Sequence, residues 1–156
     1  MRCFLLIWFL IFSGCSIKEY EHTKSKIIII KSPKLKFADI GYVRNSNKDI
    51  ELELFVAGKA IEKITINHLI CTTQGCMSKS GFNASYLNTA YPEDILQNII
   101  LGDEIYGGKN LVKIKNGFEQ HIKTKYVDIF YRVYPHVIYF KDMENKIIFK
   151  LKDTDE

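Results

Sequence analysis

Short alternating runs of apolar and polar residues fill most of the chain after residue 26, and they predict a protein built mainly of β-strands. The clearest alternation runs from Asp49 to Ala57, where Leu52, Leu54 and Val56 share one face. Gly58-Lys59 makes a short turn, so the next segment should pair back as a hairpin. In the first half the pattern predicts strands over 27–30, 36–44, 49–57 and 60–70, the last with Ile64, Ile66 and His68 on one face.

The last third of the chain predicts an antiparallel meander of four or five consecutive strands. Asn116-Gly117 has the composition of a primed two-residue hairpin turn. In the final strand Ile147, Phe149 and Leu151 should face inward. The strands are expected over 111–115, 118–123, 126–134, 137–141 and 146–152.

One segment between these two sets of strands has helical periodicity. Pro92 suits the first position of a helix and Gly102 suits its end. Between them an apolar stripe predicts a helix that packs on a sheet or covers a groove as a lid; it consists of Ile95, Leu96, Ile99 and Ile100. A second, shorter helix is expected within 72–90, where Phe82, Tyr86 and Leu87 have helical spacing.

These elements together predict an α+β fold that is mostly antiparallel β: a curved sheet or half-open barrel with a C-terminal meander and one or two short helices packed on it. Aromatic residues make up 13% of the chain, and the segment 126–134 is apolar on both faces. A sheet of that kind is covered on both faces or curls round a cavity. Two interpretations stay open: a well-filled core with a helix on it, or an apolar groove for acyl chains or a peptide.

The first residues have the parts of a secretory signal. Met1-Arg2 gives a positive start, residues 3–12 are all apolar, and Ser13-Gly14 supplies small residues at a cleavage site. The apolar run is too short to span a bilayer, which needs about 20 residues. We therefore expect a signal peptide over 1–14, a polar tether over 15–26 and a single β-rich domain over 27–156, a size sufficient for one domain.

Ser13-Gly14-Cys15 resembles the lipobox of bacterial lipoproteins, although Phe12 stands where Leu is usual. The resemblance implies that Cys15 is the lipidated residue, carrying acyl chains such as palmitate, and that the chain is cut just before it. Several acyl chains hold a protein firmly on a membrane. Ser16 implies, by the same resemblance, export to the outer membrane of a bacterial cell envelope. The alternatives are an ordinary secretory signal with an incidental Cys and a buried N-terminal helix.

The net charge and the remaining cysteines bear on two kinds of function, nucleic-acid binding and metal or redox chemistry. The net charge is +4, and no basic run supports nucleic-acid binding. Cys71 and Cys76 form an even pair in an exported chain, which predicts a disulfide that closes a small loop. The rival interpretation is a metal or redox pair, but zinc would need two further ligands and the spacing is not that of a redox motif.

No catalytic constellation is visible in the sequence. His22, His68, His121 and His136 lie far apart, and Gly107-Gly108-Lys109 is too short for a phosphate loop. The serines lack the context of a nucleophile elbow. We therefore expect a protein that is not an enzyme and that needs neither a metal ion nor another cofactor.

The order of the elements is similar to that of the lipoprotein-localisation family, over residues 36–152. In that family a half-open antiparallel barrel, covered by helices, encloses a cavity for acyl chains. The resemblance implies a membrane-anchored lipoprotein that binds the acyl chains of a lipid or a lipoprotein in a concave apolar groove. The alternative is a structural or assembly lipoprotein that binds a partner protein of the envelope. The first needs an apolar pocket under the helix, and the second needs an exposed patch or a free strand edge.

Overall fold

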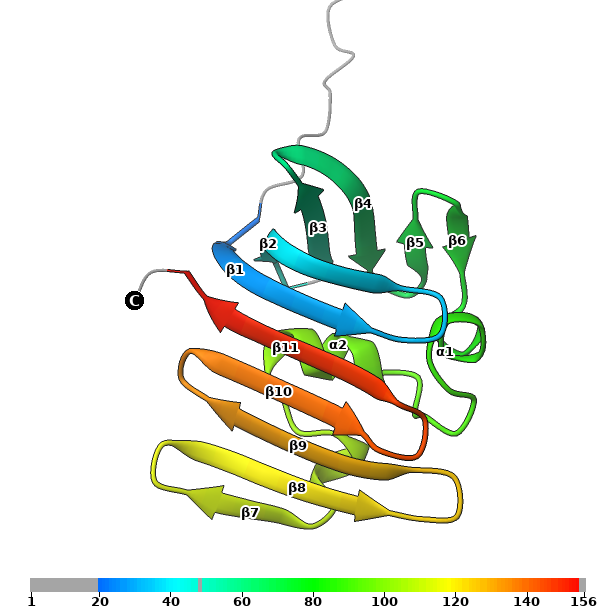
Figure 1. The fold of residues 1–156 in the computed structure, drawn as a ribbon, viewed down its shortest axis with the longest axis vertical. Helices are drawn as coiled ribbons and strands as arrows, with labels where there is room; N and C mark the ends of the chain where they lie inside the picture. Colours follow the sequence, from blue (N-terminus) through cyan, green and yellow to red (C-terminus); the bar gives the residue numbers. More distant parts are fainter. Residues whose placement is uncertain (1–19, 48, 155–156) are drawn as a thin grey trace, which may run out of the picture.

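The computed structural model describes residues 20–47 and 49–154, and Figure 1 shows their arrangement. The described strands form one antiparallel sheet of 11 strands, in the order β6-β5-β4-β3-β2-β1-β11-β10-β9-β8-β7. Strands that pair are consecutive in the sequence except at one seam, where β1 pairs with β11, and β6 and β7 are the two edge strands. The sheet is therefore two meanders joined edge to edge, and the predicted mostly antiparallel α+β fold with an open, curled sheet is confirmed.

The N-terminal meander begins earlier than the sequence predicts. Its strands are β1 (His22–Lys31), β2 (Lys36–Asn45), β3 (Ile50–Val56), β4 (Lys59–Ile66), β5 (Ile70–Thr72) and β6 (Gly75–Met77). Polar residues 22–26 were expected in the tether, but β1 pairs with β2 from His22 onward. The tether prediction is wrong for this segment, because the backbone groups of its polar residues pair with those of β2.

The hairpin of β3 and β4 differs in detail from its prediction. The two residues between the paired ends are Ala57 and Gly58, whose φ angles of 50° and 77° make this a primed turn. A register shift at Leu54/Phe55 turns the end of β3, so Val56 is 46% exposed instead of facing inward. His68 lies outside both flanking strands and is exposed, so it does not share a strand face with Ile66.

The C-terminal meander has the five strands that the sequence predicts. They are β7 (Leu111–Ile114), β8 (Gly117–Lys123), β9 (Asp128–Tyr134), β10 (Val137–Asp142) and β11 (Ile147–Asp153). The primed turn predicted at Asn116-Gly117 is wrong, because Lys115 and Asn116 join the strands and neither has a positive φ. Gly117 is needed for another reason: a Cβ there would lie 1.9 Å from the carbonyl oxygen of Val133.

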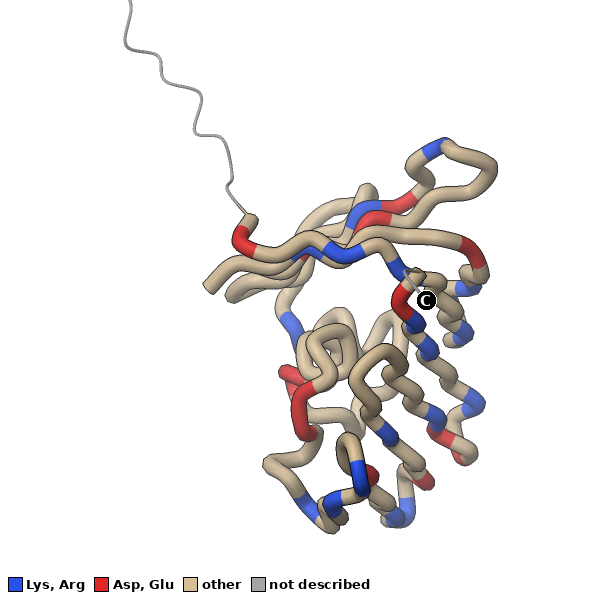
Figure 2. The backbone as a smooth tube through the Cα atoms, turned by 90° about the vertical axis from the view of Figure 1, so that its left-hand side faces the viewer, with Lys and Arg blue, Asp and Glu red and all other residues tan. Residues whose placement is uncertain are grey.

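Three short helices connect the meanders and lie on the concave side of the sheet (Figure 1). They are α1 (Lys79–Tyr86), α2 (Ile95–Leu101) and the 3-10 helix η1 (Tyr106–Gly108). In Figure 2 the two meanders meet at an angle, and the helices occupy the space between them. Helix α2 begins at Ile95 rather than Pro92, and it ends at Gly102, whose φ of 77° makes the predicted left-handed cap.

The core lies between the helices and the side of the sheet that we call the inner face. The predicted stripe of α2 is at most 2% exposed and belongs to one core cluster with inner residues of both meanders, such as Ile28 and Phe149. The other side, the outer face, is not covered by the helices (Figure 2). Because residues 20–47 and 49–154 contain all the described strands and helices and the core cluster, we expect a chain that starts at Ser16 to fold as one unit.

Candidate functional site

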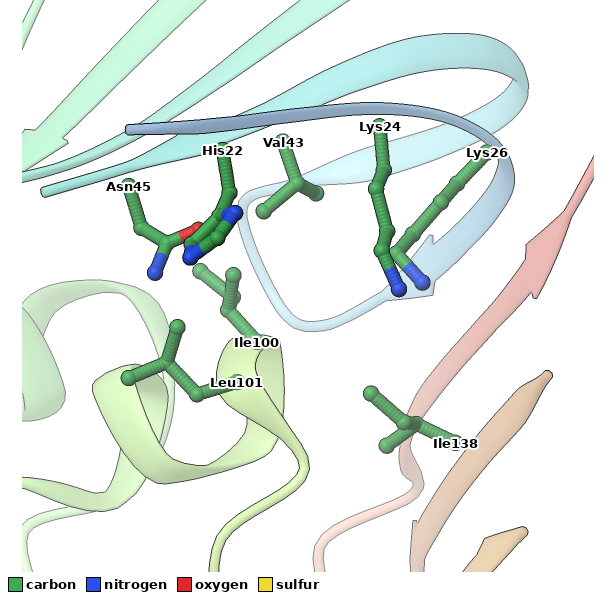
Figure 3. A pocket seen from close by; sticks show the side chains of 8 residues that line it. All are labelled: His22, Lys24, Lys26, Val43, Asn45, Ile100, Leu101 and Ile138. Atoms are coloured by element: carbon green, nitrogen blue, oxygen red, sulfur yellow. The ribbon is translucent and has the colours of Figure 1, made fainter. Parts of the chain in front are cut away.

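The inner face of β1 is basic near the start of the strand and apolar near its end. Ile28 and Ile30 are buried in the core. Successive side chains of a strand alternate between faces, so His22, Lys24 and Lys26 lie on the same face as these isoleucines. Figure 3 shows His22 pointing from β1 toward Ile100 and Leu101 of α2, and Lys24 and Lys26 extending from β1 on the side of Ile138. The strand therefore presents cations at its start and apolar side chains at its end.

Two adjoining hollows, of about 300 and 380 Å³, lie where this cationic segment faces α2 and β10. We call them together the α2 groove. They share Lys24, Lys26, Leu101 and Ile138. The other residues that line it include His22, Val43, Ile100, Phe118, Val133 and His136. The groove thus has an apolar floor and a basic wall (Figure 3).

Within the described residues, Lys24, Lys26 and His136 of the wall all lie near the carboxylate of Asp153. Lys26 donates a hydrogen bond to Asp153 Oδ1, His136 Nδ1 lies 3.4 Å from Asp153 Oδ2, and Lys24 Nζ lies 4.0 Å from the same oxygen. Burial alone would raise the pKa of Asp153, but the hydrogen bond and charge of Lys26, with His136 and Lys24, outweigh it and hold the pKa below its usual value. Among the described residues this one carboxylate cannot neutralise both lysines, so the described part of the wall keeps an excess of positive charge.

The floor of the groove is held by the last turn of α2. Tyr131, from β9, donates its hydroxyl to the carbonyl oxygens of Asp103 at 2.9 Å and Asn98 at 3.3 Å. Burial raises the pKa of Tyr131, so the hydroxyl stays protonated and remains a donor. These bonds tie β9 to the backbone at and just after the end of the helix. They fix the position of Leu101, which Figure 3 shows at the groove beside Ile100.

The residues that the sequence proposes for a groove or lid fall into two groups. Ile95, Leu96 and Ile99 lie in the core and line neither hollow of the α2 groove. Ile100 is buried too, but it lines the groove together with its neighbour Leu101. The stripe of the helix therefore packs in the core, and the hollows that α2 lines lie at its C-terminal end, not under the stripe.

The two cysteine predictions have different outcomes. Cys71 and Cys76 lie directly opposite each other on β5 and β6 and form a disulfide, which confirms the predicted pair and replaces the metal or redox alternative. The predicted lipidation site, Cys15, lies outside the described residues, as does the signal peptide. Lipidation therefore stays a prediction.

The sequence reading missed Lys24, Lys26 and Asp153 as site residues. The lysines were assigned to the tether, and Asp153 was one carboxylate among many near the end of the chain. One signal was present in the sequence: Lys24, Lys26, Ile28 and Ile30 are every second residue, so in one strand they would lie on the same face. An extension of the strand toward the N-terminus would have placed them on the core side.

Other kinds of site receive no support from the described ranges. In residues 20–47 and 49–154, no three His, Cys, Asp or Glu side chains gather closely enough to hold a metal ion. His22 and His136 line the α2 groove, whereas His121 packs on Phe130 with ring centroids 4.7 Å apart. None of the helices described here has the length and apolar character needed to cross a membrane.

Comparison of the chain with protein-family models, with curated proteins and with solved structures gives no match in any of the three.

Proposed function

We propose that this protein is a lipid-anchored lipoprotein of the bacterial outer membrane, and that it binds an anionic amphiphile in the α2 groove. The amphiphile is an acyl chain with a negatively charged head, as in a lipid or in the lipid part of a lipoprotein. The observation that carries the proposal is the basic wall over an apolar floor. Lys24 and Lys26 share one carboxylate, and Leu101 and Ile138 lie beside them.

The groove has the two parts that such a ligand needs. Ligand sites are mostly apolar, enclose about 300–1,000 Å³ and place a few polar groups to orient the ligand. An acyl chain would lie on Ile100, Leu101 and Ile138, where apolar surface is removed from water. The head would accept hydrogen bonds from Lys24, whose side chain is 63% exposed, and bonds to charged partners are the strong ones.

The proposed anchor would keep this groove near lipid. Cys15 precedes His22, the first residue of β1, by seven residues. Seven residues of extended chain reach at most about 25 Å. A lipidated Cys15 would therefore hold the start of β1, and with it the basic wall, within that distance of the membrane surface.

The alternative, a lipoprotein that binds a partner protein through a free strand edge, has less support. The edge strands β6 and β7 have three and four residues. Very short edge strands are a device by which proteins avoid pairing with other chains. The short edge strands therefore favour binding of an amphiphile over binding of a partner protein at a strand edge.

Native mass spectrometry of residues 16–156 first shows whether lipid co-purifies with the protein. The test then measures the binding of two lipids, each below its micellar concentration: anionic lysophosphatidylglycerol and zwitterionic lysophosphatidylcholine. Lys24→Gln should weaken binding of the anionic lipid about tenfold, because a hydrogen bond to a charged group contributes about 1.5–3 kcal/mol. It should change binding of the zwitterionic lipid much less. The control is Lys59→Gln, which removes the same charge at the tip of the β3–β4 hairpin.

Leu101→Ser should weaken binding of both lipids, because it removes part of the floor. The proposal is overturned if neither lipid binds, or if Lys24→Gln and Lys59→Gln bind the anionic lipid as tightly as the unchanged protein.

A further inference from the structure

The outer face of the sheet carries a second concentration of positive charge, separate from the α2 groove. On the four central strands β2, β1, β11 and β10, the outer positions hold lysines and no acidic residue. Figure 2 shows basic positions along the strands of the sheet. We call this surface the lysine face; its lysines are Lys31, Lys36, Lys141, Lys150 and Lys152.

The charges of the lysine face are not neutralised within the part of the chain that the structure describes. None of its lysines has a described carboxylate within 4.0 Å, in contrast to Lys26 or Lys63. Lys31 and Lys36 lie directly opposite each other on β1 and β2. Like charges in that position destabilise a sheet. A partner of opposite charge would remove this repulsion.

A hollow of about 270 Å³ lies at one end of the lysine face. Lys31, Lys141 and Lys146 line it, together with Met143 and Ile148. Asp142 also lines it, but its carboxylate is already engaged: Oδ2 accepts from Tyr91 and Asn145 at 2.6 Å, and Oδ1 accepts from backbone N–H groups. A small hollow lined by three lysines has the charge that a phosphate needs.

Exposed apolar side chains lie among these lysines. Ile27 and Ile40 face each other across β1 and β2 and are 43% and 47% exposed, and Met143 at the hollow is 48% exposed. Nucleic acid would gain nothing from isoleucines, because its affinity comes from phosphate neutralisation and stacking. Lysines mixed with exposed apolar side chains are the composition of surfaces that lie in a membrane interface.

We propose that the lysine face docks on an anionic lipid bilayer. The lysines contact phosphate groups, one headgroup occupies the hollow at Lys31, Lys141 and Lys146, and Ile27, Ile29 and Ile40 enter the boundary between headgroups and acyl chains. This contact does not depend on the α2 groove, which lies on the inner face. It would fix the orientation of the domain, with the α2 groove on the side of the sheet turned away from the bilayer, whereas the acyl anchor alone would only tether the domain.

The test is flotation of residues 16–156, which lack acyl chains, with two kinds of vesicle: phosphatidylcholine alone, and equal parts of phosphatidylcholine and phosphatidylglycerol. Binding should require phosphatidylglycerol and weaken as salt is added, because salt screens surface charge. Lys150→Gln with Lys152→Gln should weaken binding by roughly 25-fold, about fivefold for each lysine near an anionic surface. Ile27→Ser with Ile40→Ser should weaken it and leave the salt dependence in place.

The matched control is Lys113→Gln with Lys115→Gln, which removes two lysines from the edge hairpin of β7 and should weaken binding far less. Lys24→Gln should leave flotation unchanged, so failure of the groove proposal is seen separately. Three results would each overturn the docking proposal: no preference for phosphatidylglycerol, equal losses in the control pair and the β11 pair, or tighter binding to soluble polyphosphate than to vesicles.

Discussion

Lys26 and Asp153 lie directly opposite each other in the β1–β11 pairing, and Lys26 donates a hydrogen bond to the Asp153 carboxylate. The pair therefore joins the two meanders at their seam. It also supplies the negative charge of the α2 groove. The same contact thus contributes to the stability of the sheet and limits the positive charge that a ligand can meet.

Asp153→Asn should lower stability and raise the affinity of the groove for anions. Breaking a buried ion pair costs about 3–5 kcal/mol, and the side chains of Lys26 and Asp153 are only 10% and 14% exposed, so we expect a loss of about 2–4 kcal/mol. Lysophosphatidylglycerol should bind more tightly, because Lys24, Lys26 and His136 lose their competing carboxylate. Urea unfolding and lipid titration measure the two effects.

The control for this change is Asp128→Asn, whose partner Lys123 has a side chain that is 79% exposed. Exposed pairs contribute about 0–1 kcal/mol, so this variant should lose little stability. If Asp153→Asn bound the anionic lipid less tightly than the unchanged protein, the carboxylate would be a part of the ligand site rather than its competitor.

The free energy of unfolding should fall at acid pH because the carboxylates of Glu51 and Asp153 become protonated. Glu51 on the outer face accepts from Arg44 at 2.8 Å and from Tyr20 at 2.7 Å, and it pairs with Lys63 at 2.7 Å. Burial alone would raise its pKa, but Lys63, Tyr20 and Arg44 together lower it. The same burial and hydrogen bond raise the pKa of Tyr20 to about 12, so the phenol remains a donor.

A carboxylate with a lowered pKa in the folded state stabilises the protein above its ordinary pKa, and this contribution is lost as the pH falls through the lowered value. The free energy of unfolding should therefore be constant near neutral pH and fall as the pH drops below about 4.5. Glu51→Gln should lower stability at neutral pH and make the acid fall shallower, while Glu93→Gln, at an exposed position, should do neither. Parallel acid curves for all three proteins would contradict this role of Glu51.

Removal of the disulfide should have a modest effect. Cys71 and Cys76 close a loop of six residues, for which the chain-entropy relation gives about 2 kcal/mol. The double change Cys71→Ser and Cys76→Ser should cost that amount in urea unfolding and leave lipid binding intact, since β5 and β6 do not line the α2 groove. A peptide mass map of the non-reduced protein that showed two free thiols would remove the disulfide itself.

Replacement of Cys15 tests the anchor. Cys15→Ala should abolish acyl labelling of the full chain in cells and release the protein from the stable, high-salt-resistant membrane fraction. If the lysine face acts as proposed, some protein should remain on membranes at low salt and dissociate at high salt. Labelling that is unchanged in the variant would exclude Cys15 as the lipidated residue.

Much of the fold could be predicted because one face of most of the longer strands is buried. Ile147, Phe149 and Leu151 alternate without interruption, so β11 and its orientation follow from period two. Gly102 ends α2 as expected, because the backbone there needs a left-handed residue. Sequence rules were sufficient where residues close together in the chain determine the structure.

The errors arise where a distant contact determines the structure. Gly117 is required by the carbonyl of Val133, from a strand that follows later in the chain, and a turn rule cannot represent that contact. Lys26 is buried because Asp153 lies opposite it, at the other end of the sequence. The α2 groove depends on the same long-range pairing, so the sequence pattern alone could not assemble it.

Helix α2 has two roles, since it fills part of the core and forms part of the groove floor. Ile99 is fully buried, whereas its neighbour Leu101 is partly exposed and lines the α2 groove. Ile99→Ala should cost about 2–5 kcal/mol, as large-to-small changes in a core do, and change lipid affinity little. Leu101→Ala should cost less stability and weaken binding of lysophosphatidylglycerol and lysophosphatidylcholine alike.

Hydrogen exchange decides whether the whole helix moves. If Ile95, Leu96 and Ile99 hold α2 in the core, its amides should exchange as slowly as those of β9, and added lysophosphatidylglycerol should protect only the last turn, near Leu101. A lid would belong to the low-stability end of the structure, because such elements open locally. Fast exchange along all of α2 that slows when lipid is added would therefore contradict the fixed floor and show that the helix opens as a lid over the inner face.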